Sequence, residues 1–344
     1  MDFYSFLLLW LALFAASTGG TWAFCHYATR NGLIDTPNHR SSHSAPTPRG
    51  GGIVIVLLAT SLWIFATALD ILSLNQGLAL IVAGATAAAA GYMDDKGHLS
   101  KRTRFSAHIL ASSLVVILLS PMPTVVVSAS YTVDLNQLRW FPIVMVAIVW
   151  LTNLYNFMDG IDGIAASHAL CALAASGATL YIMGEVDQSK LLILLFAIVF
   201  GFLIWNWPPA KLFMGDVGST YLGIMFGTLA LITAETLSIW FWIIILATFI
   251  GDASWTLMIR IFSGQNWREA HRLHAYQKIS PTQLRHKSTA LLYSLFTLLW
   301  LFPLAYITAA NPSYFFVTIT LAYAPVLLFC YKNSAGLISG DSRK

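Results

Sequence analysis

The stretch IVMVAIVWLTNLYNFMDGIDG (residues 143–163) decides the fold, because an apolar segment runs directly into a polar motif. Asn153, Asn156 and Asp159 recur every three residues, which places them on one slanting stripe of a helix. The glycines that follow free the backbone to turn closely around a ligand. Amide and carboxylate oxygens are the hard ligands that Mg²⁺ accepts, usually together with substrate phosphates. The stretch therefore predicts a membrane helix that ends in a metal or phosphate site.

The composition of the whole chain agrees with a membrane location. Of 344 residues, 57% are hydrophobic and only 10% are charged, and the mean hydropathy is +0.70. Soluble domains carry about 25% charged residues, so this chain cannot cover a water-facing surface. A net charge of +4 is too mild to indicate nucleic acid as a partner. Three distant cysteines without CxxC spacing support neither a disulfide framework nor a zinc site.

Eleven apolar stretches approach the length that crosses a bilayer. They are residues 3–24, 52–72, 76–93, 105–120, 139–157, 164–184, 191–207, 220–236, 239–259, 289–310 and 314–331. Eleven crossings with the N-terminus outside place 17 of the 19 Lys and Arg residues on the inner side, as the positive-inside rule requires. We therefore predict an all-α integral membrane protein, a single polytopic domain with about eleven transmembrane helices, a periplasmic N-terminus and a cytoplasmic C-terminus.

The inner connections carry the chemistry. They lie near residues 25–51, 94–104, 158–163, 208–219 and 260–288. Asp94 and Asp95 follow an Ala-rich span, and two adjacent carboxylates are costly to desolvate at a membrane edge. They are either a solvated helix end with Lys96 as counter-ion, or a metal or phosphate site.

Asp216 stands between glycines in KLFMGDVGS (residues 211–219), at the expected start of a helix. A glycine and a helix N-terminus offer free N–H groups to an anion, while the carboxylate offers oxygen to a metal. Asp216 could equally cap the helix that it begins, and the two roles are compatible.

The longest inner connection contains His271, Arg272 and His274. Six cations lie between Arg260 and Lys287, against one acid. The segment is either a basic patch on anionic lipid or a clamp for phosphates and sugar hydroxyls.

The Pro- and Gly-rich segment 35–52, which includes Arg40 and His43, is either a linker or a lip around an anionic substrate.

Beyond an enzyme, two other classes of protein remain open. A transporter would also carry intramembrane carboxylates and broken helices. However, nine of the fifteen acidic residues gather on the inner side rather than at the midplane. The other class is a lipid-binding scaffold, which has no need of a motif with the spacing NxxNxxDGxDG, so this motif argues against it.

Taken together, these segments resemble the polyprenyl-phosphate N-acetylhexosamine-1-phosphate transferase family (glycosyltransferase family 4). Four motifs occur in matching order between Asp35 and about Lys278: DxPxxRxxH with PTPxGG, an Asp-Asp pair after an Ala/Gly-rich span, NxxNxxDGxDG, and FMGDxGS. The histidine segment is most similar to the bacterial branch that starts O-antigen and related surface polysaccharides. The translocase of peptidoglycan synthesis has consecutive histidines there. Arg272 and Leu273 separate the two histidines of this chain, which argues against a muramoyl-pentapeptide substrate.

The resemblance implies a reaction and a set of residue roles. A UDP-N-acetylhexosamine and undecaprenyl phosphate would give undecaprenyl-diphospho-N-acetylhexosamine and UMP with Mg²⁺, or Mn²⁺ as an alternative, on the cytoplasmic face of the bacterial inner membrane. The partners implied are these two substrates and membrane lipid, with no nucleic acid and with a homodimer left open. By the same resemblance, Asn156 and Asp216 would hold the metal, Asp94 would face the polyprenyl phosphate and Asp95 would support the phosphate site. Asn153, Asp159 and Asp162 would line the nucleotide pocket, and His271, Arg272 and His274 would bind the sugar phosphate or the sugar. The catalytic set implied is Asp94, Asp95, Asp216, His271, Arg272 and His274, and further substrate-binding residues are Arg40, His43, Lys96 and Lys211.

Overall fold

Each of the eleven apolar stretches is helical in the computed structural model, which describes residues 2–37, 43, 45–97, 99–128, 131–266, 269 and 271–338. The α-helices in this part of the chain are α1 (Phe3–Arg30), α2 (Gly52–Ala68), α3 (Leu74–Leu78), α4 (Gly84–Asp95), α5 (Lys101–Leu118), α6 (Phe141–Phe157), α7 (Ile164–Ile182), α8 (Val186–Asn206), α9 (Gly215–Ile232), α10 (Ala234–Ile245), α11 (Ala247–Phe262), α12 (Ala275–Ile279), α13 (His286–Phe296), α14 (Phe302–Ala310) and α15 (Phe315–Lys332). Two π-helical turns, η1 (Ala79–Ala83) and η4 (Thr297–Leu301), join α3 to α4 and α13 to α14 as continuous rods.

The predicted all-helical membrane architecture is thus present, but the number of membrane spans is not settled at eleven. Eight helices in the described chain are long and apolar enough to cross a bilayer, and a bent pair, α10 with α11, makes up to nine. The helix axis bends by 51° between α10 and α11. Helix α2 is apolar, but with 17 residues it is not counted among these eight. Helix α5 has sufficient length but carries three cations in its first turn (Lys101, Arg102 and Arg104).

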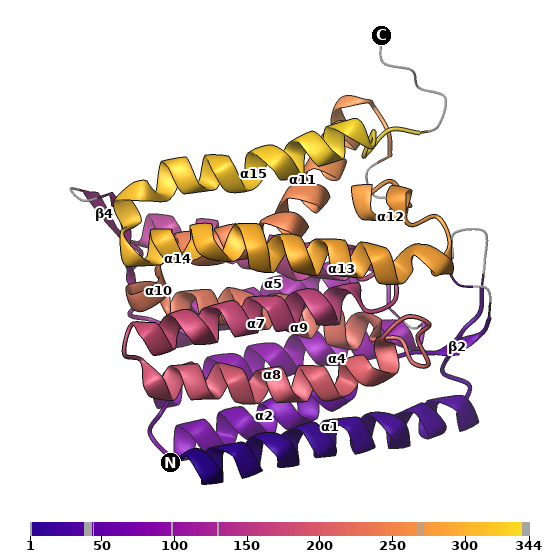
Figure 1. Cartoon of the computed structure of the whole chain (residues 1–344), viewed down its shortest axis with the longest axis horizontal. Helices are drawn as coiled ribbons and strands as arrows, with labels where there is room; N and C mark the ends of the chain where they lie inside the picture. The colour runs from indigo at the N-terminus through magenta and orange to yellow at the C-terminus, as the bar shows by residue number, and fades with distance from the viewer. Residues whose placement is uncertain are drawn as a thin grey trace.

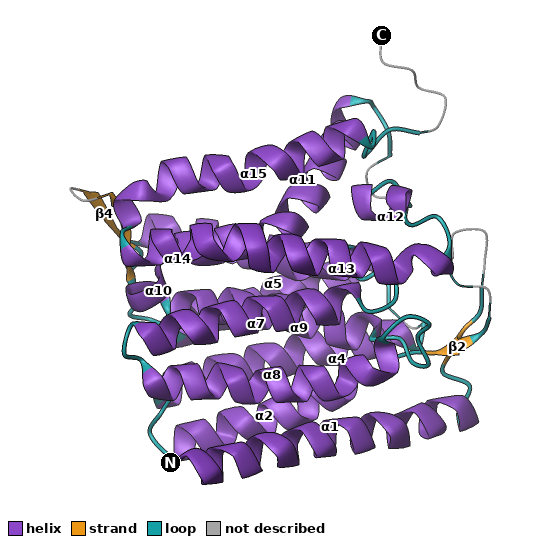
Figure 2. Ribbon diagram, viewed as in Figure 1, coloured by secondary structure: helices purple, strands orange, loops and turns teal. Residues whose placement is uncertain are grey.

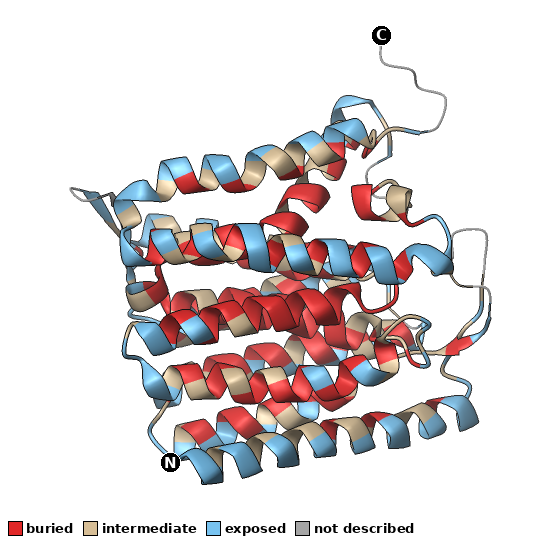
Figure 3. Cartoon of the chain, in the orientation of Figure 1, coloured by how far each residue is buried: buried red, intermediate tan, exposed pale blue. Residues whose placement is uncertain are grey.

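The helices run roughly parallel, and α1 and α15 form opposite outer sides of the bundle (Figure 1). Helix α1 begins at the end of the bundle opposite to the end at which α15 finishes. The inner helices are the buried ones (Figure 3): 83% of the apolar window of α7 and of α9 is buried, against 6% for α1. The apolar side chains of α1 therefore face the lipid, while α7 and α9 form the centre of the core.

Two small antiparallel hairpins, which the sequence did not predict, lie at opposite ends of the bundle (Figure 2). The first pairs β1 (Ile34–Asp35) with β2 (Thr47–Pro48), at the end where α12 also lies. The second pairs β3 (Thr124–Ser128) with β4 (Tyr131–Asp134). The C-terminal ends of α4 and α6 and the N-terminal ends of α5, α7 and α9 meet near β2. All the polar motifs of the sequence therefore converge on one end of the bundle.

Candidate active site

Asp95 joins the C-terminal end of α4 to the N-terminal end of α9 through hydrogen bonds. Its carboxylate accepts hydrogen bonds from the backbone N–H groups of Asp216 at 3.0 Å and Val217 at 3.1 Å. These N–H groups lack intrahelical partners, and an anion at a helix N-terminus is also favoured by the helix dipole. Gly91 permits the contact, since a Cβ there would lie 2.4 Å from the Asp216 carbonyl oxygen. Asp95 is therefore the cap of α9, and through the backbone it positions Asp216.

Arg104, on the first turn of α5, joins two of the predicted site residues. Its Nη1 atom lies 2.6 Å from Asp94 Oδ2 and 3.1 Å from Asp216 Oδ2. The two carboxylates are thus neighbours, although 122 positions separate them in the chain. The side chains of Asp94, Arg104 and Asp216 are 20–27% exposed, so they are reachable from solvent. This trio forms the centre of the candidate site.

Asn156 reaches the same trio from the end of α6. Its Nδ2 atom donates to Ser219 Oγ at 3.0 Å, and its amide also interacts with the Asp216 carboxyl group. Ser219 in turn donates to the Gly215 carbonyl oxygen at 3.1 Å, which holds the turn that begins α9. The pair predicted to hold a metal, Asn156 and Asp216, is therefore brought together by the fold.

Asp159 and Asn153 complete the polar stripe of α6. Burial, together with the nearby charges of Asp216, Asp95 and Asp162, raises the pKa of Asp159 well above its ordinary value. Asp159 therefore keeps its proton to a higher pH than an ordinary carboxyl group does, unless an added cation offsets those charges. The Asn153 amide donates to the Val149 carbonyl oxygen of its own helix at 2.7 Å.

Asp162, which the resemblance places in the nucleotide pocket, lies in a buried hydrogen-bond network. It is 3% exposed, and its Oδ2 atom accepts from the Ala210 N–H and from Gln283 Nε2, both at 3.1 Å. His286 Nδ1 lies 3.3 Å from the same oxygen. Burial alone would raise the pKa of Asp162, but the bonds from His286, Ala210 and Gln283 hold it below its ordinary value. Asp162 ties three connections together and has little surface left for a nucleotide.

The histidine segment covers the Asp-Gly turn of α6. The Tyr276 hydroxyl donates to the Phe157 carbonyl oxygen at 2.8 Å, and a Cβ on Gly160 would lie 2.3 Å from that hydroxyl. The rings of His271 and His274 are 5.0 Å apart between centroids, and Arg272 lies between them in the chain. Burial, with smaller effects from neighbouring cationic groups, lowers the pKa of His271 to about 3. His271 is therefore neutral at pH 7 and can serve as a hydrogen-bonding group.

Two predicted substrate-binding lysines lie against aromatic rings. Lys96 Nζ lies 4.4 Å from the centroid of the Tyr92 ring, and Lys211 Nζ lies 5.3 Å from that of Trp205. Both contacts are in the range of cation–π interactions. The structure holds these ammonium groups beside the site rather than between its carboxylates.

The segment between β1 and β2 contributes one residue that can be located. His43 packs edge-on against Phe213, with ring centroids 4.9 Å apart, and its Nε2 atom lies 3.8 Å from Asp35 Oδ2. Arg40, which the resemblance also implied as a binding residue, lies outside the described residues. Trp267, Arg268 and Ala270 of the histidine segment do so too.

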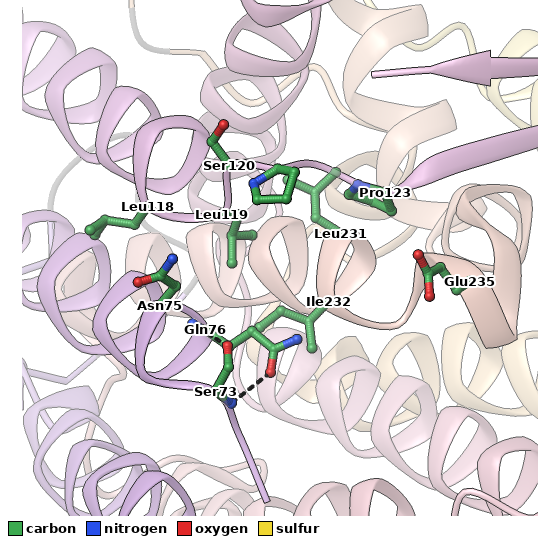
Figure 4. A pocket seen from close by; sticks show the side chains of 11 residues that line it. Ser73, Asn75, Gln76, Leu118, Leu119, Ser120, Pro123, Leu231, Ile232 and Glu235 are labelled. Atoms are coloured by element: carbon green, nitrogen blue, oxygen red, sulfur yellow. Dashed lines mark hydrogen bonds between the residues drawn. The ribbon is translucent and has the colours of Figure 1, made fainter. Parts of the chain in front are cut away.

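A surface pocket of about 210 Å³ lies away from this chemistry (Figure 4). Its walls include Ser73, Gln76, Leu119, Ile232 and Glu235. These residues come from the start of α3, the far ends of α5 and α9, and the start of α10, whereas Arg104 and Asp216 lie at the opposite ends of α5 and α9. None of the predicted site residues that the structure describes lines the pocket.

The donor set at the centre of the site suits a magnesium ion that shares its ligands with phosphate. No group of three or more His, Cys, Asp or Glu side chains able to hold a metal occurs among the residues that the structure describes. Mg²⁺ does not need such a cage, because one or two carboxylates plus substrate phosphates and water complete its octahedron. Asp94, Asp216 and the Asn156 amide provide that kind of partial set.

Two residues that sequence reasoning missed take part in this architecture. Arg104 was counted only as one of the inner cations, yet it lies on the helix face of His108, Ala111 and Val115, all of which are buried. A cation on an otherwise buried stripe was the available signal. Asp252 lies within α11 and is fully buried, and it holds the start of α12.

Fold and site define a polytopic membrane protein with an acidic, phosphate-compatible centre at one end of its helical bundle. Residues 77–234 match the model of glycosyl transferase family 4, which supports membership of this family. The matched segment runs from α3 to the start of α10, and so contains Asp94, Arg104, Asn156 and Asp216.

Similar proteins are named as polyprenyl-phosphate sugar-phosphate transferases. The chain is 28% identical to the "probable undecaprenyl-phosphate N-acetylglucosaminyl 1-phosphate transferase" of Bacillus subtilis (strain 168), over 77% of this chain and 74% of the relative. It is 30% identical to the decaprenyl-phosphate N-acetylglucosaminephosphotransferase of Mycolicibacterium smegmatis, over 61% of this chain and 56% of that protein. It is 28% identical to the phospho-N-acetylmuramoyl-pentapeptide-transferase of Geobacillus kaustophilus, over 57% of this chain and 63% of that protein. The comparisons give no support to the transporter alternative.

Proposed function

We propose that this protein transfers N-acetylhexosamine-1-phosphate from a UDP-sugar to undecaprenyl phosphate and releases UMP. The observation that carries the proposal is the meeting of Asp94, Asp216 and Asn156 around Arg104 at one end of the bundle. The names of the family relatives supply the class of acceptor and of transferred group. The arrangement suits a reaction in which several negative charges must be brought together.

In the proposed reaction, an oxygen of the acceptor phosphate attacks the phosphorus that carries the sugar. A new P–O–P bond forms, the bond from that phosphorus to the bridging oxygen breaks, and UMP leaves with this oxygen. The acceptor should be largely dianionic at neutral pH, since phosphate monoesters have a second pKa near 6. No proton must therefore be removed, and Asp94 orients the acceptor rather than acting as a strong base.

Mg²⁺, held by Asn156 and Asp216, would neutralise the diphosphate of the donor. The Arg104 guanidinium group would exchange a carboxylate partner for a phosphate of the substrate, because guanidinium groups pair with either anion in the same fork geometry. The neutral His271, with Arg272 and His274, would hydrogen-bond the sugar phosphate. In this proposal, the metal, Arg104 and the histidine segment together balance the charges of the two phosphate groups.

We prefer direct displacement to a covalent intermediate on Asp94. The two differ in one measurement: a covalent phosphosugar intermediate would allow labelled UMP to exchange into UDP-sugar without any lipid acceptor. Exchange of this kind would overturn direct displacement.

Release of UMP tests the function itself. Protein purified in detergent is supplied with Mg²⁺, undecaprenyl phosphate and a panel of UDP-linked GlcNAc, GalNAc, N-acetylfucosamine and N-acetylquinovosamine. We expect UMP and a lipid-linked product with one of these donors. A 6-deoxy sugar is our preference, because the histidine segment is similar to that of the O-antigen branch. If no donor gives UMP, the proposal fails.

We also propose that the site faces the cytoplasm of a bacterium and that the product initiates O-antigen or a related surface polysaccharide. The distribution of Lys and Arg supports the orientation. Cysteine labelling in intact cells tests it: Lys190→Cys should react with a membrane-impermeant maleimide, and Lys101→Cys should not. The reverse pattern would place the site outside.

A further inference from the structure

Asp252 is a buried carboxylate for which the proposed reaction has no use. It lies on α11, just after the bend that separates this helix from α10, and it is 0% exposed. An ionised group at such a position in a membrane protein is costly unless its surroundings compensate the charge. The partners of Asp252 therefore indicate what it does.

The four hydrogen bonds to Asp252 come mainly from the histidine segment and its neighbour α13. Oδ1 accepts from the Ala275 N–H at 2.9 Å and from the Thr256 hydroxyl at 3.2 Å. Oδ2 accepts from the Tyr276 N–H at 3.0 Å and from the Tyr293 hydroxyl at 2.9 Å. Two consecutive N–H groups on one carboxylate make Asp252 the cap of α12, just as Asp95 is the cap of α9.

Asp252 also faces a predicted substrate-binding histidine. His274 immediately precedes α12, and its Nδ1 atom lies 3.4 Å from Asp252 Oδ1. The contact is electrostatic, since Nδ1 makes no hydrogen bond to any described residue. The carboxylate packs against the ring, which is 4% exposed, and so restricts how the imidazole can turn.

The other parts of α12 are attached to different elements. Its centre is tied to the end of α6 by the bond from Tyr276 to the Phe157 carbonyl oxygen. Its last turn is tied to the C-terminal turn after α15, because Lys278 Nζ donates to the carbonyl oxygens of Ser334 and Leu337. Asp252 supplies the attachment at the histidine end.

We propose that Asp252 is a positioning residue for donor binding. By fixing both the start of α12 and the ring of His274, it sets the place of the histidine pair above the Asp-Gly turn of α6. The inference rests on the proposed function, because it takes the sugar phosphate of a UDP-sugar as the group that the histidines bind. It predicts that loosening Asp252 weakens the binding of the donor and leaves that of the lipid acceptor unchanged.

A pair of tyrosine variants tests this prediction. Tyr293→Phe removes one hydrogen bond to Asp252 and keeps its charge. Tyr323→Phe is the matched control, because it also removes one tyrosine hydroxyl bond, which is 2.9 Å long and goes to the Ile243 carbonyl oxygen of α10 rather than to Asp252. Asp252→Asn is the stronger variant, since an amide cannot accept from both N–H groups and the Tyr293 hydroxyl with the same two atoms.

The measurements are KM for the UDP-sugar, KM for undecaprenyl phosphate, and binding of the UDP-sugar by calorimetry without acceptor. The donor is the UDP-sugar that gives most UMP in the panel. We expect a several-fold rise in donor KM and Kd for Tyr293→Phe and about 10–100-fold for Asp252→Asn, as for other residues that orient a ligating histidine. The acceptor KM should stay unchanged in both, and Tyr323→Phe should resemble the wild type in everything.

Two results would overturn the proposal. One is an unchanged donor KM in Tyr293→Phe and Asp252→Asn. The other is an equal rise of donor and acceptor KM, which is the signature of general loosening. If Asp252→Asn does not fold, Tyr293→Phe against its control decides the question. Wild-type protein that neither releases UMP nor binds any UDP-sugar would instead refute the proposed function, and this inference with it.

Discussion

Replacing Arg104 by glutamine should make the stability of the protein depend on divalent cations. The guanidinium contacts Asp94 and Asp216 through one nitrogen, so its loss leaves two adjacent carboxylates without their counter-charge. Removing one partner of a fully buried ion pair costs about 3–5 kcal/mol, and each charge-assisted hydrogen bond contributes about 1.5–3 kcal/mol. Since these side chains are 20–27% exposed, we expect a loss at the lower end, about 3 kcal/mol.

This loss can be read as a change in melting temperature. With the usual entropy of unfolding per residue, 344 residues convert about 3 kcal/mol into a decrease of about 4 °C. Mg²⁺ at 100 times its dissociation constant would return about 2.7 kcal/mol. The Arg104→Gln protein should therefore melt about 4 °C below wild type in EDTA and regain most of the difference in Mg²⁺.

The assay is thermal unfolding in detergent, followed by intrinsic tryptophan fluorescence with EDTA and with MgCl₂. Arg102→Gln is the matched control, because Arg102 lies two residues away on α5 and is exposed. We expect the control to melt like wild type in both buffers. If Arg104→Gln melts at the wild-type temperature in EDTA, or if Mg²⁺ shifts wild type and variant equally, the reasoning about the carboxylate pair is wrong.

Four further variants probe other parts of the site. Asp216→Asn should reduce turnover by at least about 10²-fold while the circular dichroism stays unchanged; near-normal turnover would remove Asp216 from the metal site. Burial and nearby carboxylates raise the pKa of Asp159, so the folded chain retains a proton that the unfolded chain releases, and stability is lost as the pH rises above about 4. Asp159→Asn should therefore melt higher than wild type at pH 8 in EDTA but turn over more slowly, and a lower melting temperature would contradict this. Because the pKa of His271 is lowered to about 3, the unfolded chain binds a proton below about pH 6.5 that the folded chain does not, and stability falls as the pH falls. His271→Asn should lose less melting temperature than wild type between pH 7 and pH 5, and equal losses would exclude His271 as the cause. Lys278→Met removes two bonds to the C-terminal turn, and we expect donor KM to rise about 3–10-fold, with rescue by Lys278→Arg. This rise corresponds to about 0.7–1.4 kcal/mol, less than the about 1.5–3 kcal/mol of one hydrogen bond from a charged group, because the turn acts on the donor only through α12. An unchanged donor KM would show that the turn is dispensable.

The helices could be predicted from the sequence because apolar runs of near-bilayer length have few alternatives to a helix in lipid. The number of membrane crossings could not be predicted from the sequence. Helix α5 begins with three cations, and α10 and α11 meet at a sharp bend at Leu246 rather than in one straight rod. Such departures depend on the neighbours of a helix and not on its own composition.

The central residues of the site could be predicted for a related reason. Asn156, Asp159 and Asp216 stand at the ends of apolar segments, where a polar residue has no packing role to explain it. The sequence could not show which carboxylates accept hydrogen bonds from the protein itself and which are left for a metal or substrate. Asp95 caps a helix that begins 120 positions later, and Asp162 binds groups from two distant connections. These roles depend on contacts between segments far apart in the chain.

The link between Lys278 and the C-terminal turn has a consequence for biosynthesis. The carbonyl groups of Ser334 and Leu337 are made by the ribosome only after α15. Domains form as the chain emerges from its N-terminal end, so the earlier helices can insert well before translation ends. The histidine segment gains this anchor only after α15 has been synthesised, and nascent chains that stall before α15 is complete should accumulate as inserted but inactive protein.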